Sequence, residues 1–442
     1  MTTPAQHRDP AFPVAHPRPA QGWLNDPNGL CRVDGVWHVF FQFNPHSARH
    51  ERIHWGHLSS PDLVDWTVEP TALTPSTDGP DHAGCWSGVM GFDDATPVAV
   101  YSGVEAHDNT SSVTLVRGSE DLRHWEARRH VAASMPEDEA VTAVRDPFLV
   151  SIAGRRWALQ GAGLADGQAA VLLYDAEDLW HWKYRGVWLR SDLAPDALEA
   201  QIWECPQLVH LPRSGCWVLV VARWQKADHS EVTLVDTKAL ILEIEAPDAE
   251  DPTGTPRPRI FGCSEVDFGD SFYAPQILAE PDRALLIGWA REQRPQATSD
   301  EAGWAGLLTW PRELSVAGGR LISAPAEECA GWRTGETQHD DGRHPVEVPD
   351  ACDIVIEAPQ HNDAEQVTLH RVHRATDGSR HLEEVFTGWA DRIVIDHSIV
   401  ELYRRDGAPS TLRVEPDHGQ VWQVDTRGAG LRWWALRPWS PE

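Results

Sequence analysis

The sequence predicts an all-β protein, namely a five-bladed β-propeller followed by a C-terminal β-sandwich. Three observations lead to this prediction. Apolar residues rarely recur with the period of a helix. A short signature ending in Pro or Gly occurs five times, at intervals of about 60 residues, which suits one four-stranded blade per repeat. After residue 330 the repeat is lost, and short β-branched runs separated by Gly and Asp follow, as in a small antiparallel sandwich.

Each repeat combines a tripeptide signature with an apolar run. The signatures are Asn25-Asp26-Pro27, Trp86-Ser87-Gly88, Arg145-Asp146-Pro147, Glu204-Cys205-Pro206 and Tyr273-Ala274-Pro275. The runs that follow are 36–43, 97–103, 156–161, 216–222 and 284–289, and each has the composition of a strand bounded by turns. Because a propeller arranges equivalent strands around one channel, we expect the five signatures to line that channel.

The same pattern sets the expected domain boundaries. Residues 1–330 are assigned to the propeller, 331–350 to a linker rich in Gly, Asp, His and Thr, and 351–442 to the sandwich. The sandwich strands are expected at 353–356, 366–372, 392–395, 399–403, 411–414 and 420–424. This part has no carboxylate cluster like that of the repeats, so we assign it a structural or docking role, with a surface for a homodimer.

Charge and composition exclude several classes of function. The chain has 38 basic and 67 acidic residues and a formal net charge of −29, which argues against nucleic acid and acidic membranes as partners. Its apolar runs are too short to span a bilayer, and its first residues contain no apolar signal segment. The seven cysteines include no C-x-x-C pair, so we expect reduced thiols and a cytoplasmic protein.

Three carboxylates, Asp26, Asp146 and Glu204, occupy near-equivalent repeat positions. Hydrolysis of a glycosidic bond needs two such groups. Polar neighbours are expected to keep Asp26 ionised as a nucleophile, whereas an apolar setting is expected to raise the pKa of Glu204 for an acid role. Arg145 is expected to keep Asp146 charged, although adjacent strand residues point to opposite faces. A turn role for each Asp-Pro pair and a calcium site are the alternatives.

The motifs resemble those of glycoside hydrolase family 32, the β-fructofuranosidases. The resemblance rests on the string Trp23-Leu24-Asn25-Asp26-Pro27-Asn28-Gly29-Leu30, on Arg145-Asp146-Pro147, and on Trp203-Glu204-Cys205-Pro206. It extends through 41–45, 55–57, 86–88, 267–276, 304–314 and 396–403, in the family's order and over nearly the whole chain. Two residues depart from the family pattern: Leu24 stands where the family often has Met, and Gln207 where it often has an acidic residue. Gln207 could change the hydrogen bonding around Glu204 and therefore its acid strength.

The resemblance implies a fold, a mechanism and a pocket. The fold is the five-bladed propeller with a β-sandwich, and the mechanism is retaining. Asp26 would attack the fructosyl unit, Glu204 would act as acid and then as base, and Asp146 would stabilise the transition state. The expected partner is a sugar, sucrose or a fructo-oligosaccharide, with no metal or other cofactor. The fructose pocket would be lined by Asn25, Gln42, Trp55, Trp86, Ser87, Arg145, Cys205, Tyr273 and Trp289, with the tryptophans stacking on sugar.

Several alternatives stay open at this point. Sucrose 6-phosphate as the substrate would require a cationic pocket, for which Arg223, Lys226, Arg291 and Arg294 are candidates if they are not engaged in surface ion pairs. A covalent intermediate also permits fructosyl transfer to another sugar. A related propeller could act on arabinosides or xylosides with inversion. A non-catalytic sugar-binding module is disfavoured because all three carboxylates are present.

Overall fold

The structure, a computed structural model, describes residues 9–106, 110–138, 140–193, 198–226, 232–247, 254–357, 366–374, 379–416 and 421–439. Residues 1–8 and 440–442 of the expected domains, and Gln420 of the expected strand 420–424, lie outside the described residues. The described part is nearly all β, as predicted, with a short α-helix, α1 (Gln296–Ala302). Within it, no helix has the length and hydropathy needed to cross a membrane.

The described residues up to 325 form five successive sheets. The first contains β1 (Gly22–Val33), β2 (Val36–Asn44), β3 (His54–Ser60), β4 (Thr67–Val68) and β19 (Trp304–Ala305). The second contains β5 (Gly84–Asp93), β6 (Thr96–Val104), β7 (Ser112–Arg117) and β8 (His130–Ala133). The third contains β9 (Val141–Ile152), β10 (Arg155–Leu164), β11 (Ala169–Asp175) and β12 (Lys183–Arg190).

The remaining two of these sheets follow the same order. The fourth contains β13 (Ile202–Leu211), β14 (Cys216–Lys226), β15 (Val232–Glu245) and β16 (Arg257–Glu265). The fifth contains β17 (Phe272–Ala279), β18 (Ala284–Ala290), β20 (Leu307–Leu308), β21 (Arg312–Ala317) and β22 (Arg320–Pro325). The five apolar runs of the sequence pattern correspond to β2, β6, β10, β14 and β18, which confirms them as strands.

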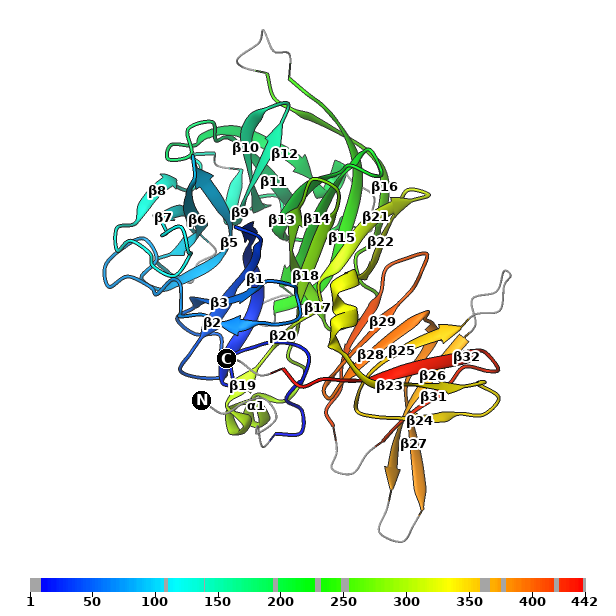
Figure 1. The fold of residues 1–442 in the computed structure, drawn as a ribbon. Coiled ribbons are helices and arrows are strands. Elements are labelled where there is room, and N and C mark those ends of the chain that lie inside the picture. The colour runs from blue at the N-terminus through cyan, green and yellow to red at the C-terminus, as the bar shows by residue number, and fades with distance from the viewer. Residues whose placement is uncertain are drawn as a thin grey trace.

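The first long strand of each sheet, here called the inner strand, contacts its counterparts in a closed cycle. β1 contacts β5, β5 contacts β9, β9 contacts β13, β13 contacts β17, and β17 returns to β1. The short strand β19 pairs in parallel with β1, joining Gly22 to Trp304 and Trp23 to Ala305. A late segment of the chain therefore completes the first sheet, and the five inner strands lie next to one another within the N-terminal part (Figure 1).

Each inner strand has a β-bulge at its signature. In β1, Leu24 pairs with Phe43 and Pro27 with Phe41, so two residues, Asn25 and Asp26, lie opposite Gln42. The same two-against-one register occurs in β5, β9, β13 and β17. Proline is tolerated at a bulge because its missing N–H interrupts no regular ladder, and the bulge re-aims the adjacent side chains. The Asp-Pro pairs are thus bulges inside long strands, and not turns between strands.

The C-terminal part consists of two sheets that pack face to face. The larger contains β23 (Arg333–Asp340), β25 (Ala351–Glu357), β28 (Arg392–Asp396), β29 (Ile399–Tyr403), β30 (Ser410–Arg413) and β32 (Gly430–Leu436). The smaller contains β24 (Val346–Val348), β26 (Gln366–Arg374), β27 (Arg380–Trp389) and β31 (Val421–Asp425). Ile354 and Leu402 of the larger sheet share one apolar core with Leu369 and Trp422 of the smaller.

More than half of residues 331–350, expected to be a linker, forms two strands of this sandwich. The strand β23 pairs with β32, and β24 pairs with β31. The side chains of β23 are almost all exposed, on both faces of an edge strand. The segment therefore has no apolar alternation, which is the signal on which strand prediction depends, and its composition resembles that of a loop.

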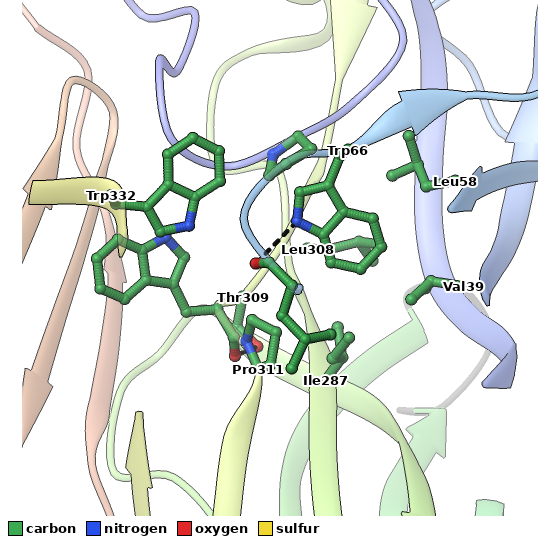
Figure 2. A pocket seen from close by; sticks show the side chains of 11 residues that line it. Val39, Leu58, Trp66, Ile287, Leu308, Thr309, Pro311 and Trp332 are labelled. Carbon is green, nitrogen blue, oxygen red and sulfur yellow. Dashed lines mark hydrogen bonds between the residues drawn. The ribbon is translucent and has the colours of Figure 1, made fainter. Parts of the chain in front are cut away.

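The N-terminal sheets and the sandwich meet through an apolar core, in which Trp66, Trp310 and Trp332 pack with Val394 and Tyr403 of the sandwich, and through buried charges. Trp66, Trp310 and Trp332 surround a small apolar cavity of about 20 Å³, and the Trp66 indole N–H donates to the Leu63 carbonyl at 3.0 Å (Figure 2). Nearby, the buried Arg312 donates to Asp267 at 2.8 Å and to Glu401 at 2.8 Å. These contacts fix the sandwich against the sheets that carry the signatures.

Candidate active site

The carboxylate of Asp26 lies half-buried at the bulge of β1 and is surrounded by donors. Its Oδ2 accepts the Ser87 hydroxyl at 2.6 Å and the Gln42 side-chain N–H at 3.1 Å. Its Oδ1 accepts the Asn25 side-chain N–H at 3.0 Å. The three donors come from β1, β2 and β5, so two sheets converge on this one carboxylate.

Loss of surrounding water raises the pKa of Asp26 to about 6. The hydrogen bond from Ser87 opposes that rise, the negative charge of Glu204 adds to it, and the bonds from Asn25 and Cys205 also oppose it. Near neutral pH Asp26 is therefore predominantly ionised and available as a nucleophile.

Asp146 and Cys205 join the third and fourth sheets to the site. Both adopt a left-handed conformation, with φ of 58° and 46°, at the bulges of β9 and β13. Oδ2 of Asp146 accepts the backbone N–H of Cys205 at 2.9 Å. The Cys205 thiol lies 3.5 Å from Oδ2 of Asp146 and 3.7 Å from Oδ2 of Asp26. The thiol thus stands between two of the three carboxylates.

Glu204 has polar partners rather than the apolar setting that the sequence predicted. Its Oε1 accepts the Arg145 guanidinium at 2.9 Å, and its Oε2 accepts the Tyr273 hydroxyl at 2.9 Å. Trp203, its apolar neighbour in the sequence, is fully buried on the other face of the strand. The alternation of side chains along β13 separates Trp203 from the carboxylate that it was expected to surround.

Arg145 therefore pairs with Glu204, and not principally with its neighbour Asp146. The guanidinium carbon lies 5.8 Å from the ring centre of Trp86 and 5.9 Å from that of Trp224. Desolvation, followed by the charge of Glu204, raises the pKa of Asp146, and Arg145 only partly offsets the rise. Asp26 and Asp146 therefore both have a raised pKa, because like charges lie close together in a site shielded from water.

Aromatic rings surround the carboxylates. Tyr273 and Trp289 pack against Cys205, with Trp23 and Leu234 against the same cluster. Trp23 meets Trp289 edge to face, with ring centres 6.0 Å apart. These rings provide flat apolar surface beside hydrogen-bonding groups, the combination that suits a sugar ring.

Trp55 does not line the site, contrary to expectation. Its side chain has no exposed surface and packs in a core with Phe40 and Tyr101. Its indole N–H donates to the backbone carbonyl of Trp86 at 3.0 Å. Trp55 therefore supports the wall of which Trp86 forms a part. The eight other expected pocket residues contact the three carboxylates or the residues bonded to them: Asn25, Gln42, Trp86, Ser87, Arg145, Cys205, Tyr273 and Trp289.

The predicted pocket residues do not include four residues that the structure places at the site: Trp23, His50, Trp224 and Leu234. Trp23 precedes Asn25 by two residues, so its position just before the first signature was available as a signal. Trp224 pairs with Ile202 across β13 and β14, which a strand-register argument from Glu204 could have found. His50 lies between β2 and β3, and no periodic pattern marks it.

The candidate phosphate-binding cations are mostly engaged elsewhere. Arg223 donates to both oxygens of Asp236, at 2.6 Å each. Arg294 pairs with Glu292 at 2.9 Å and with Asp9 at 2.8 Å. Arg291 donates to the Leu234 carbonyl at 2.6 Å and to the Asp270 carbonyl. Among the described residues, no group of three His, Cys, Asp or Glu has a geometry suited to a metal ion.

Comparison with known proteins gives a consistent result. The model of the glycosyl hydrolases family 32 N-terminal domain matches residues 16–325. A Klebsiella pneumoniae sucrose-6-phosphate hydrolase is 30% identical over 97% of this chain and 94% of its own length. An Escherichia coli raffinose invertase is 32% identical over 73% of this chain, and the match spans 66% of that protein. The Bombyx mori GH32 beta-fructofuranosidase in complex with sucrose has a TM-score of 0.78 and 25% identity, covering 98% of this chain and 96% of the other.

Proposed function

Because the chain belongs to glycosyl hydrolase family 32, we propose that it hydrolyses terminal β-D-fructofuranosyl bonds of sucrose or short fructans. The proposal rests on one observation above all. Asp26 and Glu204 come from different sheets, meet at one site, and have separate sets of hydrogen-bond donors. Two carboxyl groups in distinct environments are what a glycosidase requires.

Asp26 acts as the nucleophile. Three hydrogen bonds hold the carboxylate in place, so little reorientation precedes attack on the anomeric carbon. Attack forms the bond between a carboxylate oxygen and the fructosyl unit as the glycosidic bond breaks. Water then cleaves this covalent intermediate, and two successive displacements retain the configuration at the anomeric carbon.

Glu204 acts as acid in the first step and as base in the second. Arg145 and Tyr273 each hold one of its oxygens, which fixes the plane of the carboxyl group. It gives a proton to the leaving oxygen in the first step and takes one from the attacking water in the second. Asp146, fixed by the Cys205 backbone N–H, binds fructose hydroxyls and stabilises the transition state.

Charge around the site favours an unphosphorylated substrate. The leaving sugar lies on the side of Glu204, because Glu204 protonates the leaving oxygen. Arg223 on that side is neutralised by Asp236, and Lys238 pairs with Asp236 at 3.3 Å. A phosphate dianion would have to compete with Asp236 for these two cations. We therefore favour sucrose or a fructan over sucrose 6-phosphate.

The architecture and setting belong to the same proposal. The five sheets are the blades of a five-bladed propeller, supported by the closed cycle of inner strands. The division falls between a propeller to residue 330 and a sandwich after it, with β23 and β24 in the sandwich. A cytoplasmic location and a homodimer through the sandwich stay predictions.

A release assay on sucrose, sucrose 6-phosphate, inulin-type and levan-type oligosaccharides, and an aryl arabinoside tests the proposal. We expect release of fructose from sucrose or a fructan, and loss of that activity in Asp26→Asn with an unchanged circular dichroism spectrum. Transfer products would indicate a fructosyltransferase. Silence on every fructoside, or full activity of Asp26→Asn, would refute the proposed function.

A further inference from the structure

The two oxygens of Asp26 are held by two amide side chains. Asn25 donates its Nδ2–H to Oδ1, and Gln42 donates its Nε2–H to Oδ2. Gln42 also donates to the Ser87 hydroxyl, which in turn donates to Oδ2 of Asp26. Both N–H groups of Gln42 are therefore used on the side of the carboxylate.

The chemistry of these groups allows only one orientation of each amide. An ionised carboxylate accepts hydrogen bonds and donates none. An amide rotated by half a turn would place its carbonyl oxygen against Asp26, where two acceptors repel. The amide oxygens of Asn25 and Gln42 must therefore face away from Asp26, and each needs a donor on that outer side.

A ring nitrogen supplies each outer donor. The indole N–H of Trp23 donates to Oδ1 of Asn25 at 2.7 Å. Nε2 of His50 lies 3.2 Å from Oε1 of Gln42, and since that oxygen only accepts, Nε2 carries the proton. Both hydrogen bonds end on an amide and not on Asp26. Trp23 therefore acts through Asn25, and His50 acts through Gln42.

Ring contacts hold the two donors in place. Trp23 and His50 meet edge to face, with ring centres 5.9 Å apart and planes at 81°. His50 meets Trp86 at 5.9 Å and 65°. His50 is exposed at the edge of the site, where water could also satisfy Gln42. A water would first have to be immobilised, whereas the packed ring is already in position.

We propose that Trp23 and His50 are positioning residues, each of which fixes the orientation of one amide and thereby keeps an N–H directed at one oxygen of Asp26. The inference rests on the proposed function, because it assigns these rings to the nucleophile of that reaction. It predicts that removal of either outer donor destabilises Asp26 in its ionised form and in the orientation that the reaction needs. Substrate binding should change less wherever an aromatic ring is kept, because the flat surface for the sugar remains.

The test compares rings with and without a donor. Trp23→Phe and His50→Phe keep an aromatic ring and remove the N–H. Trp23→His and His50→Gln restore an N–H donor at the same positions. Trp188→Phe is the matched control, because it removes a comparable indole bond, to the Pro256 carbonyl at 2.7 Å, in the outer strand of the third sheet. Circular dichroism and the melting temperature check that each variant folds.

Each Phe variant should lower kcat about tenfold on sucrose and change KM less than about twofold, because misorientation of the nucleophile affects the chemical step. The acid limb of the pH profile should move up by about half a unit, because the ionised form of Asp26 loses support. The other titratable groups facing Asp26, namely Asp146, Glu204, Cys205 and Tyr273, are unchanged in these variants.

The donor-restoring variants should recover most of the lost kcat, and Trp188→Phe should match the wild type. Equal losses in the Phe and donor-restoring variants would overturn the proposal, as would a loss confined to KM with an unmoved acid limb. If the wild type cleaves no fructoside, the proposed function fails, and neutron crystal structures of the two Phe variants, which distinguish an amide nitrogen from an amide oxygen, decide the inference separately. Amides rotated away from Asp26 would support it, and amides left in place would overturn it.

Discussion

Replacement of Ser87 by Ala gives the most direct test of the electrostatics at Asp26. The Ser87 hydroxyl donates to Oδ2 of Asp26 at 2.6 Å, and among the groups that lower the pKa of Asp26 it has the largest effect. Ser87 is almost completely buried, at 3% exposure, so solvent screens the bond little. The substitution removes the O–H donor and leaves the neighbouring carboxylates in place.

The size of the effect follows from the value of one charge-assisted bond. A hydrogen bond to a charged group is worth about 1.5–3 kcal/mol, and about 1.4 kcal/mol corresponds to one pKa unit. The pKa of Asp26, about 6 with Ser87 present, should therefore rise by about one to two units in Ser87→Ala. A water molecule in the vacated space would donate a hydrogen bond to Asp26 and offset part of the loss, so we expect the pKa of Asp26 to rise by about one unit.

The sign of the pH effect follows from the role of Asp26. The nucleophile must be ionised, so activity is lost as the pH falls through its pKa. The acid limb of kcat/KM should therefore move to higher pH in Ser87→Ala, and activity near pH 5 should fall about tenfold relative to the wild type. Initial rates of fructose release from sucrose, measured between pH 4 and 9, give the profile.

A matched control separates this effect from a general loss of stability. Ser59→Ala removes a buried hydroxyl that donates to Glu69 at 2.8 Å, on β3 and away from Asp26. It should leave the acid limb where it is. An acid limb that does not move in folded Ser87→Ala, or that moves equally in Ser59→Ala, would refute the reasoning.

Three further predictions concern catalysis and stability. Glu204→Gln should reduce turnover most for substrates with poor leaving groups, and equal losses on sucrose and on an activated aryl fructoside would argue against the acid role. Fructose should be released first as the β-anomer, and early α-anomer in the NMR spectrum would indicate inversion. Burial lowers the pKa of His16, but its hydrogen bonds to Asp396 and Glu401 outweigh burial and raise it to about 9. The resulting stabilisation of the folded state, on the order of 3 kcal/mol, is complete below pH 6.5 and is lost as the pH rises through about 9. The melting temperature of His16→Gln should therefore fall less steeply than that of the wild type between these pH values. An equally steep fall in the variant would contradict this.

The sequence by itself determined the repeat and the chemistry that the repeat carries. The tripeptide signatures recur because each inner strand contains the same kind of bulge. In every sheet the residue just before the Pro or Gly of the signature lies in that bulge. Since equivalent strands surround one axis, Asp26, Asp146 and Glu204 could be predicted to meet without any knowledge of distances. The strands that follow the inner strands, namely β2, β6, β10, β14 and β18, could also be predicted, because a buried apolar run bounded by turns is a local signal.

Only the tertiary structure decided the partners of those residues. Arg145 could have paired with its neighbour Asp146, but the bulge directs it to Glu204 on the next sheet. Trp55 has a sequence context that suits sugar stacking, yet its place behind Trp86 buries it completely. The strand β23 has no apolar alternation and forms only because β32 offers it an edge. Side-chain direction at a bulge, burial and edge pairing depend on neighbours distant in sequence, and a local pattern does not encode them.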